Sequence, residues 1–283
     1  MASVLDAPHA GIGAPISVEA ALNYTRKTGV RPVNYTFDPP DGVPRNSGEI
    51  DTHRVTIHNA RLEIGLGLDR SGFTLIDQRS PLEDWTDYRD PERVKAHYYP
   101  AVDAALRART GAVKVVIFDH TLRDSTAPAG RAEVRDPVRR VHDDQTFDSA
   151  PNRVRKHLPP DEAEQRLRGR FAIVNFWRPI GGPIEQAPLA LCDARSIAPD
   201  DLIPSDLVYR DWTGETYSFA YNPRHRWYWY PEQQPDEVTL LKVFDSATDG
   251  TARLTAHTAF DDPNTAFDAS PRRSIEVRTL LFW

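Results

Sequence analysis

The stretch VHDDQTFDS, residues 141–149, holds residue types that bind metal ions. His142 and Asp144 are two positions apart, so in a β-strand both side chains project from one face while Asp143 points away. An imidazole and a carboxylate on one face supply two metal ligands. The alternative is a solvated acidic turn or a helix cap, because a His-x-Asp pair is common by chance.

A third ligand is available much later in the chain. His257 lies in AHTAFDDP, within a segment whose pattern is typical of a buried strand. Two histidines and one carboxylate, with the remaining positions open, form the facial triad of non-haem Fe(II) oxygenases. His142, Asp144 and His257 are therefore the candidate catalytic and metal-binding residues. The alternative for His257 alone is a core histidine with satisfied hydrogen bonds.

An arginine and a serine follow His257 in PRRSIEVR, at the start of the last strand pattern. Alternation places Arg272 and Ser274 on one face, where a guanidinium and a hydroxyl could hold the far carboxylate of 2-oxoglutarate. A surface arginine beside a strand-initiating serine is the alternative. The order His-x-Asp, distant His, Arg-x-Ser is much rarer by chance than its parts, and it favours an Fe(II)/2-oxoglutarate site.

Two further motifs offer groups for a cosubstrate or a substrate. In NFWRP, Asn175 and Trp177 share one face of a strand and Arg178 lies on the other. Asn175 and Arg178 are candidates to bind a carboxylate, and Trp177 is a candidate wall of the substrate pocket. In HRWYWY, Tyr228 or Tyr230 is a candidate for the same wall. Core packing is the alternative for the aromatic residues.

Strands must position these residues, and strand patterns dominate the chain. Period-two alternation appears in VTIHNARLEIG and GFTLIDQRS, and more strand patterns follow residue 171. A helix is expected over residues 90–111, kinked or split at Pro100, and a short helix over DEAEQRLRG. The opening fifty residues are expected to form an extended N-terminal arm. The spacing of the strands predicts an antiparallel sandwich or barrel.

The composition narrows the classes of function. The chain has 283 residues, 40% of them hydrophobic, which is compatible with one elaborated domain over residues 1–283. A net charge of −6 argues against nucleic acid and anionic membrane as partners. Cys192 is the only cysteine, which excludes an intrachain disulfide framework and a multi-cysteine metal site. With no recognisable targeting segment, a cytoplasmic location is expected.

Motifs spread along the chain share one resemblance. They are NFWRPIGGPIEQAPLALCDARS (175–196), HRWYWYPEQQPDEVTLLKVFDS (225–246), HTAFDDP (257–263), PRRSIEVR (271–278), GAVKVVIFDHTLR (111–123), VHDDQT (141–146), LNYT (22–25) and the GFTLIDQRS strand. All are similar to a hydroxylase/desaturase family of fungal and bacterial secondary metabolism, which includes a cephamycin C-7 hydroxylase component and a gibberellin desaturase. The resemblance spans nearly the whole chain.

The resemblance implies a mainly β fold, with a double-stranded β-helix (jelly-roll) core and flanking α-helices. It implies non-haem Fe(II) held by His142, Asp144 and His257, and 2-oxoglutarate held through Arg272 and Ser274. A carboxylate at position 144 vacates no ligand position for chloride, so halogenation is not expected. The expected partners are a small-molecule metabolite and O2, with a second copy of the chain or a biosynthetic enzyme as further candidates.

Two other functions stay compatible with the sequence. Isopenicillin N synthase, on a related fold, uses a similar Arg-x-Ser to hold its own substrate, so the chain could be an Fe(II) oxidase that needs no 2-oxoglutarate. The second is a non-catalytic accessory protein that binds a small molecule for a biosynthetic enzyme. Dependence of turnover on 2-oxoglutarate separates the first alternative from the oxygenase, and iron binding separates the second.

Overall fold

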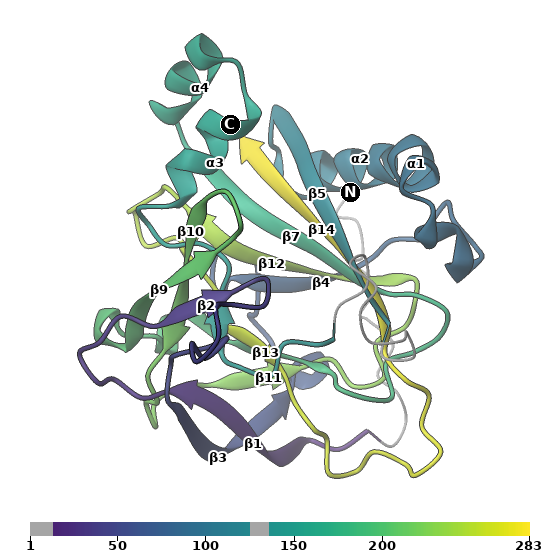
Figure 1. Cartoon of the computed structure of the whole chain (residues 1–283). Helices are drawn as coiled ribbons and strands as arrows, with labels where there is room; N and C mark the ends of the chain where they lie inside the picture. The colour runs from purple at the N-terminus through teal and green to yellow at the C-terminus, as the bar shows by residue number, and fades with distance from the viewer. Residues whose placement is uncertain (1–13, 125–135) are drawn as a thin grey trace.

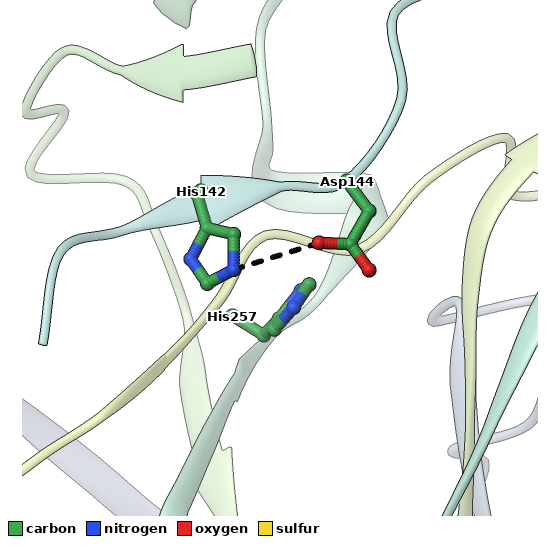
Figure 2. Close-up of side chains that lie close together, drawn as sticks. All are labelled: His142, Asp144 and His257. Carbon is green, nitrogen blue, oxygen red and sulfur yellow. Dashed lines mark ion pairs between the residues drawn. The ribbon is translucent and has the colours of Figure 1, made fainter. Parts of the chain in front are cut away.

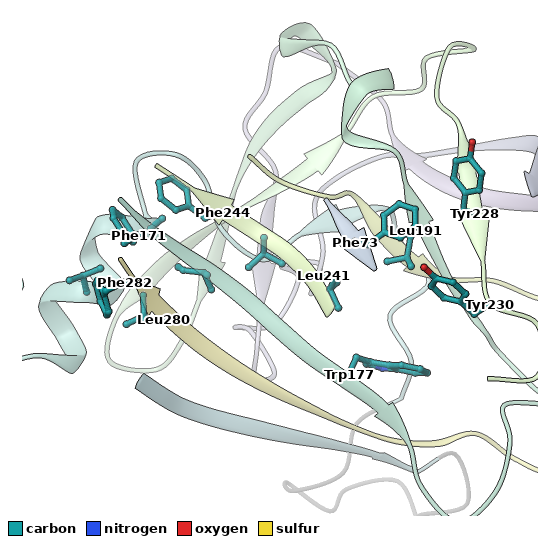
Figure 3. Close-up of a cluster of buried hydrophobic side chains, with 14 of the residues drawn as sticks. Phe73, Phe171, Trp177, Leu191, Tyr228, Tyr230, Leu241, Phe244, Leu280 and Phe282 are labelled. Carbon is teal, nitrogen blue, oxygen red and sulfur yellow. The ribbon is translucent and has the colours of Figure 1, made fainter. Parts of the chain in front are cut away.

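Two β-sheets that face each other across a hydrophobic layer form the body of the molecule (Figure 1). The computed structural model describes residues 14–124 and 136–283. The layer between the sheets contains Phe73, Phe171, Leu191 and Leu241, drawn in Figure 3. The expectation of a mainly β fold is confirmed.

The larger sheet has nine strands and curls. In sheet order they are β1 (Ser17–Thr25), β3 (Ile50–Asn59), β11 (Trp227–Trp229), β8 (Leu189–Cys192), β13 (His257–Ala259), β6 (His142–Asp143), β10 (Thr213–Phe219), β9 (Leu202–Val208) and β2 (Val33–Tyr35). β1 lies against β10 although other strands separate them in the sheet order. Tyr24 of β1 and Phe219 of β10 accordingly join one buried cluster on the concave face.

The smaller sheet has five antiparallel strands. In order they are β4 (Phe73–Asp77), β12 (Glu237–Asp245), β7 (Phe171–Pro179), β14 (Arg273–Phe282) and β5 (Lys114–Asp124). Side chains alternate between its two buried faces, so Ile173 and Trp177 face the larger sheet while Val174 and Phe176 face away. Burial on both faces explains why β7 and β12 read as almost continuous apolar runs.

Helices cover the outer face of the smaller sheet and also pack against the buried layer between the two sheets. The α- and π-helical elements are α1 (Pro91–Arg93), a π-helical turn (Val94–Tyr98), α2 (Tyr99–Thr110), α3 (Ala150–His157) and α4 (Pro160–Leu167). Val154 of α3 and Ala163 of α4 belong to the layer between the sheets. Val102 and Leu106 of α2 pack with the outward side chains of β7 and β14. The helix expected over residues 90–111 is confirmed, with the irregularity immediately before Pro100, which sits in the first turn of α2. Helix α2 ends before Gly111, which has φ 72° and so adopts the left-handed conformation that commonly terminates a helix.

The expected N-terminal arm is largely part of the sheet. β1 and β2 form the two ends of the nine-stranded sheet, because β1 pairs with β3 over its whole length and β2 pairs with β9. Residues 1–13, which belong to the expected arm, and residues 125–135 lie outside the described residues. Within the described ranges, no helix is long and apolar enough to cross a membrane.

Candidate metal centre

Three candidate ligands meet on the face of the larger sheet that looks toward the smaller one (Figure 2). His142 of β6 pairs directly with His257 of β13, so both imidazoles project from the same face. Their ring centroids are 4.3 Å apart. Asp144 directly follows β6, and one ligand atom from each of the three residues lies within 4.8 Å of the others. Residues far apart in the sequence are thus brought together as predicted.

The hydrogen bonds of the two imidazoles fix which nitrogen can bind a metal. Nδ1 of His142 is 2.8 Å from the carbonyl oxygen of Arg140, and Nδ1 of His257 is 3.1 Å from that of Thr255. A carbonyl oxygen only accepts, so Nδ1 carries the proton in both rings and Nε2 keeps its lone pair. Two imidazole nitrogens and one carboxylate oxygen at this spacing fit a non-haem Fe(II) ion.

Asp144 is held from the opposite sheet. Nδ2 of Asn175 donates to Oδ2 of Asp144 at 2.8 Å, and Nε of Arg278 lies 3.5 Å from the same oxygen. The other carboxylate oxygen, Oδ1, is 3.7 Å from Nε2 of His142. The smaller sheet therefore engages one oxygen and leaves the other directed at the imidazoles, an arrangement that suits binding of the metal through a single oxygen.

The electrostatics keep the ligand set ready for a cation at neutral pH. Burial, and then the neighbouring His257, lowers the pKa of His142 to about 4. Burial also lowers the pKa of His257. Burial alone would raise the pKa of Asp144, but Arg278 and the two histidines together hold it below its usual value. Asp143 differs, because burial and the charge of Asp144 raise its pKa well above the usual range.

Arg272 and Ser274 lie together, as alternation predicted. Both side chains are buried, and Nε of Arg272 donates to Oγ of Ser274 at 3.2 Å. A second guanidinium nitrogen donates to the carbonyl oxygen of Ala187 at 2.8 Å. Burial, followed by the positive charge of Arg123, lowers the pKa of Arg272 to about 9. An anion bound beside this guanidinium would offset the cost of burying its charge.

One cavity joins the two groups of residues. Its walls include the three candidate ligands together with Trp177 and Arg272. The guanidinium carbon of Arg272 lies 5.0 Å from the centre of the Trp177 ring. Trp177 is therefore a wall of this cavity as well as a member of the buried layer between the sheets, and its contact with a substrate stays a prediction.

Arg178 is not brought to the cavity, which corrects the expectation that it binds a carboxylate there. It follows Trp177 on β7 and so faces the other side of the sheet, where it is fully buried. Its guanidinium donates to the carbonyl oxygens of Gln78 at 2.5 Å and Pro235 at 3.2 Å, and it lies over the ring of Tyr98. These contacts give Arg178 a structural role.

Tyr228 also lies elsewhere than expected. Its ring packs between His58 and Phe73, with centroid distances of 5.8 and 6.0 Å, and it is absent from the described residues that line the cavity. Asn175 reaches the site, but its amide contacts Asp144. It therefore orients a candidate ligand, where a contact to a cosubstrate was expected.

Two further charged residues on β14 were not predicted from the sequence. Glu276 lines the cavity, and Arg278 contacts both Asp144 and Glu276, the latter at 2.8 Å. The alternation that placed Arg272 and Ser274 on one face continues to positions 276 and 278, so extending it by four residues would have found both. Gly72 was also missed. It has φ 87° and packs so closely on Thr255 that a side chain there would collide with it.

Several known proteins are similar to this chain in sequence. A family model described as "Oxidoreductase/YMDC permease-like domain" matches residues 22–282. Hydroxylase/desaturase CTB9 of Cercospora beticola is 32% identical over 281 residues, which cover 88% of this chain and 85% of that protein. Fe(II)/2-oxoglutarate-dependent dioxygenase nvfI of Aspergillus novofumigatus is 33% identical over 253 residues, with coverage of 88% and 90%. The chain belongs to this hydroxylase/desaturase family.

A solved structure supports the same assignment at the level of the fold. The iron and alpha-ketoglutarate-dependent endoperoxidase NvfI superposes with a TM-score of 0.85 at 29% identity, covering 94% of this chain and 98% of that one. The predicted jelly-roll core with flanking helices is thereby confirmed. The hydroxylase/desaturase family comprises Fe(II)/2-oxoglutarate-dependent oxygenases, so the predicted enzyme class, its two cofactors and a small-molecule substrate with O2 are confirmed for the family.

The amide of Asn175 gives a first prediction for this member of the hydroxylase/desaturase family. Asn175→Ala should weaken Fe(II) binding about 10- to 100-fold, because Asp144 loses the bond that holds Oδ2. An anaerobic competition titration against a chelator measures this. Thr239→Val is the matched control, since it removes another buried side-chain hydrogen bond, to Gln233. Equal losses in the two variants would contradict a specific role for Asn175.

Acid should destabilise the metal-free protein in a defined window. The pKa of His142 is about 4 in the folded chain and about 6.5 in an unfolded one, so the unfolded state takes up a proton first as pH falls. The free energy of unfolding should therefore drop by about 3 kcal/mol between pH 6.5 and pH 4 from this group. Urea unfolding at several pH values measures it. This drop in the free energy of unfolding should be smaller in His142→Gln. The same pH dependence in that variant would show that His142 is not its cause.

Proposed function

We propose that this chain is an Fe(II)/2-oxoglutarate-dependent oxygenase that hydroxylates or desaturates a small-molecule metabolite of secondary metabolism. His142, Asp144 and His257 are the proposed iron ligands. The observation that carries the proposal is that these three residues line the same cavity as Arg272, which pairs with Ser274. Membership of the hydroxylase/desaturase family supports it independently.

Each group in the cavity has a proposed task. Bound Fe(II), with 2-oxoglutarate and O2, would supply the oxidising chemistry that acts on an unactivated C–H bond. The chain keeps both Nε2 atoms unprotonated by fixing the opposite ring nitrogens, and Asn175 directs a single oxygen of Asp144 toward the metal position. Arg272 and Ser274 hold the far carboxylate of 2-oxoglutarate through charge-assisted hydrogen bonds.

The apolar part of the cavity is the proposed substrate side. Trp177, Val138 and Leu189 line it and exclude water from the metal position. An apolar wall beside the iron suits a substrate that reacts at carbon and carries few charges near the reacting atom. Tyr228 has no part in this wall, because its ring packs against His58 and Phe73.

An anaerobic titration tests the proposal. The purified chain is loaded with Fe(II) and then with 2-oxoglutarate, and the weak visible metal-to-ligand charge-transfer band of the chelate is followed. We expect the band to appear at one equivalent of each. Iron binding without the band would favour the Fe(II) oxidase alternative, and failure to bind iron would favour the non-catalytic accessory protein.

Further expectations concern the whole protein. We infer one domain over the full chain and a cytoplasmic location, where the single cysteine, Cys192, and an Fe(II) ion would stay reduced. The net charge of −6 supports the absence of nucleic acid and anionic membrane among the partners. Association with a second copy or with a biosynthetic enzyme stays a prediction, which sedimentation of the purified chain would test.

A further inference from the structure

A second hollow lies apart from the metal cavity, between residues 194–202 and residues 250–254. Its volume is about 260 Å³, just below the range of about 300–1,000 Å³ that drug-sized ligands occupy, so it suits a small molecule. The described residues that line it differ from those that line the metal cavity. The proposed oxygenase function therefore gives this hollow no task.

The floor of the hollow is apolar. Ala252 and Leu254 are buried beneath it, and Ile197 and Leu202 form half-buried walls. Phe147 adds an aromatic face, which packs against Tyr217 and Phe244 behind it. Such a surface binds the apolar body of a ligand through the area that it removes from water.

The charged side chains of the hollow are all of one sign. Arg70, Arg195 and Arg253 line it, and among the described lining residues none is acidic. The guanidinium of Arg253 lies 4.1 Å from the centre of the Phe147 ring, and its Nε donates to a backbone carbonyl. Arg195 pairs with Asp193 at 2.6 Å, but that carboxylate also serves Arg226, at 2.8 Å. The rim therefore carries an excess of positive charge.

A hollow of similar size elsewhere shows the contrast. It lies beside the end of α2, with a volume of about 270 Å³, and its charged residues are Asp69, Arg109 and Lys242. Lys242 is already paired with Asp69 at 2.5 Å and with Asp245 at 2.8 Å. The lysine is therefore neutralised within the protein, and the lining includes an acidic residue, so this hollow carries less positive charge than the one lined by three arginines.

We propose that the arginine-rimmed hollow is a second ligand site, which binds a small organic anion with an aromatic or aliphatic body. The apolar floor takes the body, and Arg253 with Arg70 takes the carboxylate or sulfonate. Arg253 can stack on a planar ligand and donate to its anionic group at the same time, because its planar face and its N–H edge are separate binding surfaces. This site is independent of the metal centre and of the proposed activity.

Fluorescence titration with 8-anilinonaphthalene-1-sulfonate, an aromatic anion, tests the proposal on the full chain. We expect one saturable site per chain. The neutral analogue N-phenyl-1-naphthylamine, which lacks the sulfonate, should bind about tenfold more weakly. Saturating Fe(II) and 2-oxoglutarate, added without oxygen, should leave the probe in place, since the two sites share no described lining residue.

Two variants and a control locate the probe. Arg253→Met should weaken binding about tenfold by removing the guanidinium, and Ala198→Phe should weaken it at least as much by filling the hollow. Arg54→Met removes an exposed arginine on β3, and it should leave the affinity for the probe unchanged. Circular dichroism checks that each variant is folded. If Ala198→Phe does not fold, the affinity of Arg253→Met for the probe and the affinity of the neutral analogue for the unchanged chain decide the test. Binding that is insensitive to Arg253→Met, equal for the neutral analogue, or displaced by 2-oxoglutarate would overturn the proposal.

Discussion

Asp144→Ala is expected to lower turnover at least about 10³-fold while leaving the fold intact, because the variant loses a metal ligand and loss of an outer contact alone costs about 10- to 100-fold. Asn175 and Arg278 would then face an empty position instead of a carboxylate. The uncoupled conversion of 2-oxoglutarate to succinate measures turnover without an identified substrate. Circular dichroism and thermal unfolding report on the fold.

The neighbouring aspartate supplies a matched control. Asp143 is buried, and burial with the charge of Asp144 raises its pKa well above the usual range, so the charged form is disfavoured and Asp143→Asn keeps the shape of the side chain without a charge. We expect this variant to keep its turnover within about threefold. Retained turnover in Asp144→Ala would remove Asp144 from the ligand set. Loss of turnover in Asp143→Asn would show that the wrong aspartate has been assigned.

Arg272→Ala should raise the KM for 2-oxoglutarate about 100-fold, with a smaller change in kcat at saturation. Hydrogen bonds to a charged group contribute about 1.5–3 kcal/mol. Because the far carboxylate takes no part in the chemistry, their removal should weaken the binding of 2-oxoglutarate more than it slows the reaction. Arg272→Lys should give an intermediate KM, because an ammonium keeps the charge without the planar fork. Initial rates over a range of 2-oxoglutarate concentrations measure both constants.

Arg178 is the comparison for that experiment. It is an equally buried arginine, but it lies on the outer face of β7 and donates to backbone carbonyls. Arg178→Met should lower stability and leave the KM for 2-oxoglutarate unchanged. An unchanged KM in Arg272→Ala would mean that another residue holds the carboxylate. Turnover that needs no 2-oxoglutarate in any variant would support the Fe(II) oxidase alternative.

The parts of the site that follow local rules could be predicted from the sequence. Alternation along a strand places His142 with Asp144 and Arg272 with Ser274, and it separates Trp177 from Arg178. The same rule, carried further along β14, reaches Glu276 and Arg278. Pairing of distant segments is less accessible, since the contact between Asn175 and Asp144 depends on how β7 packs opposite β6.

Elements with weak local patterns were missed. β8 has only four residues and follows a proline-rich turn, and β10 contains Gly214 and several polar residues. α3 begins with Ala150-Pro151-Asn152, a combination more typical of turns, and its helix is stabilised by the burial of Val154 against the core. In each case tertiary packing, which a single sequence does not display, decides the structure.

The pairing of β6 with β13 has a consequence for the metal-free protein. These strands have two and three residues, and the register between them consists of one pair, His142 with His257. An ion bound to both rings and to Asp144 would cross-link two strands that otherwise pair through a single pair of residues. Iron would then stabilise the structure as well as take part in the reaction. Its loss would destabilise the pairing of β6 with β13, in the part of the jelly roll that must be rigid for oxidation to be selective.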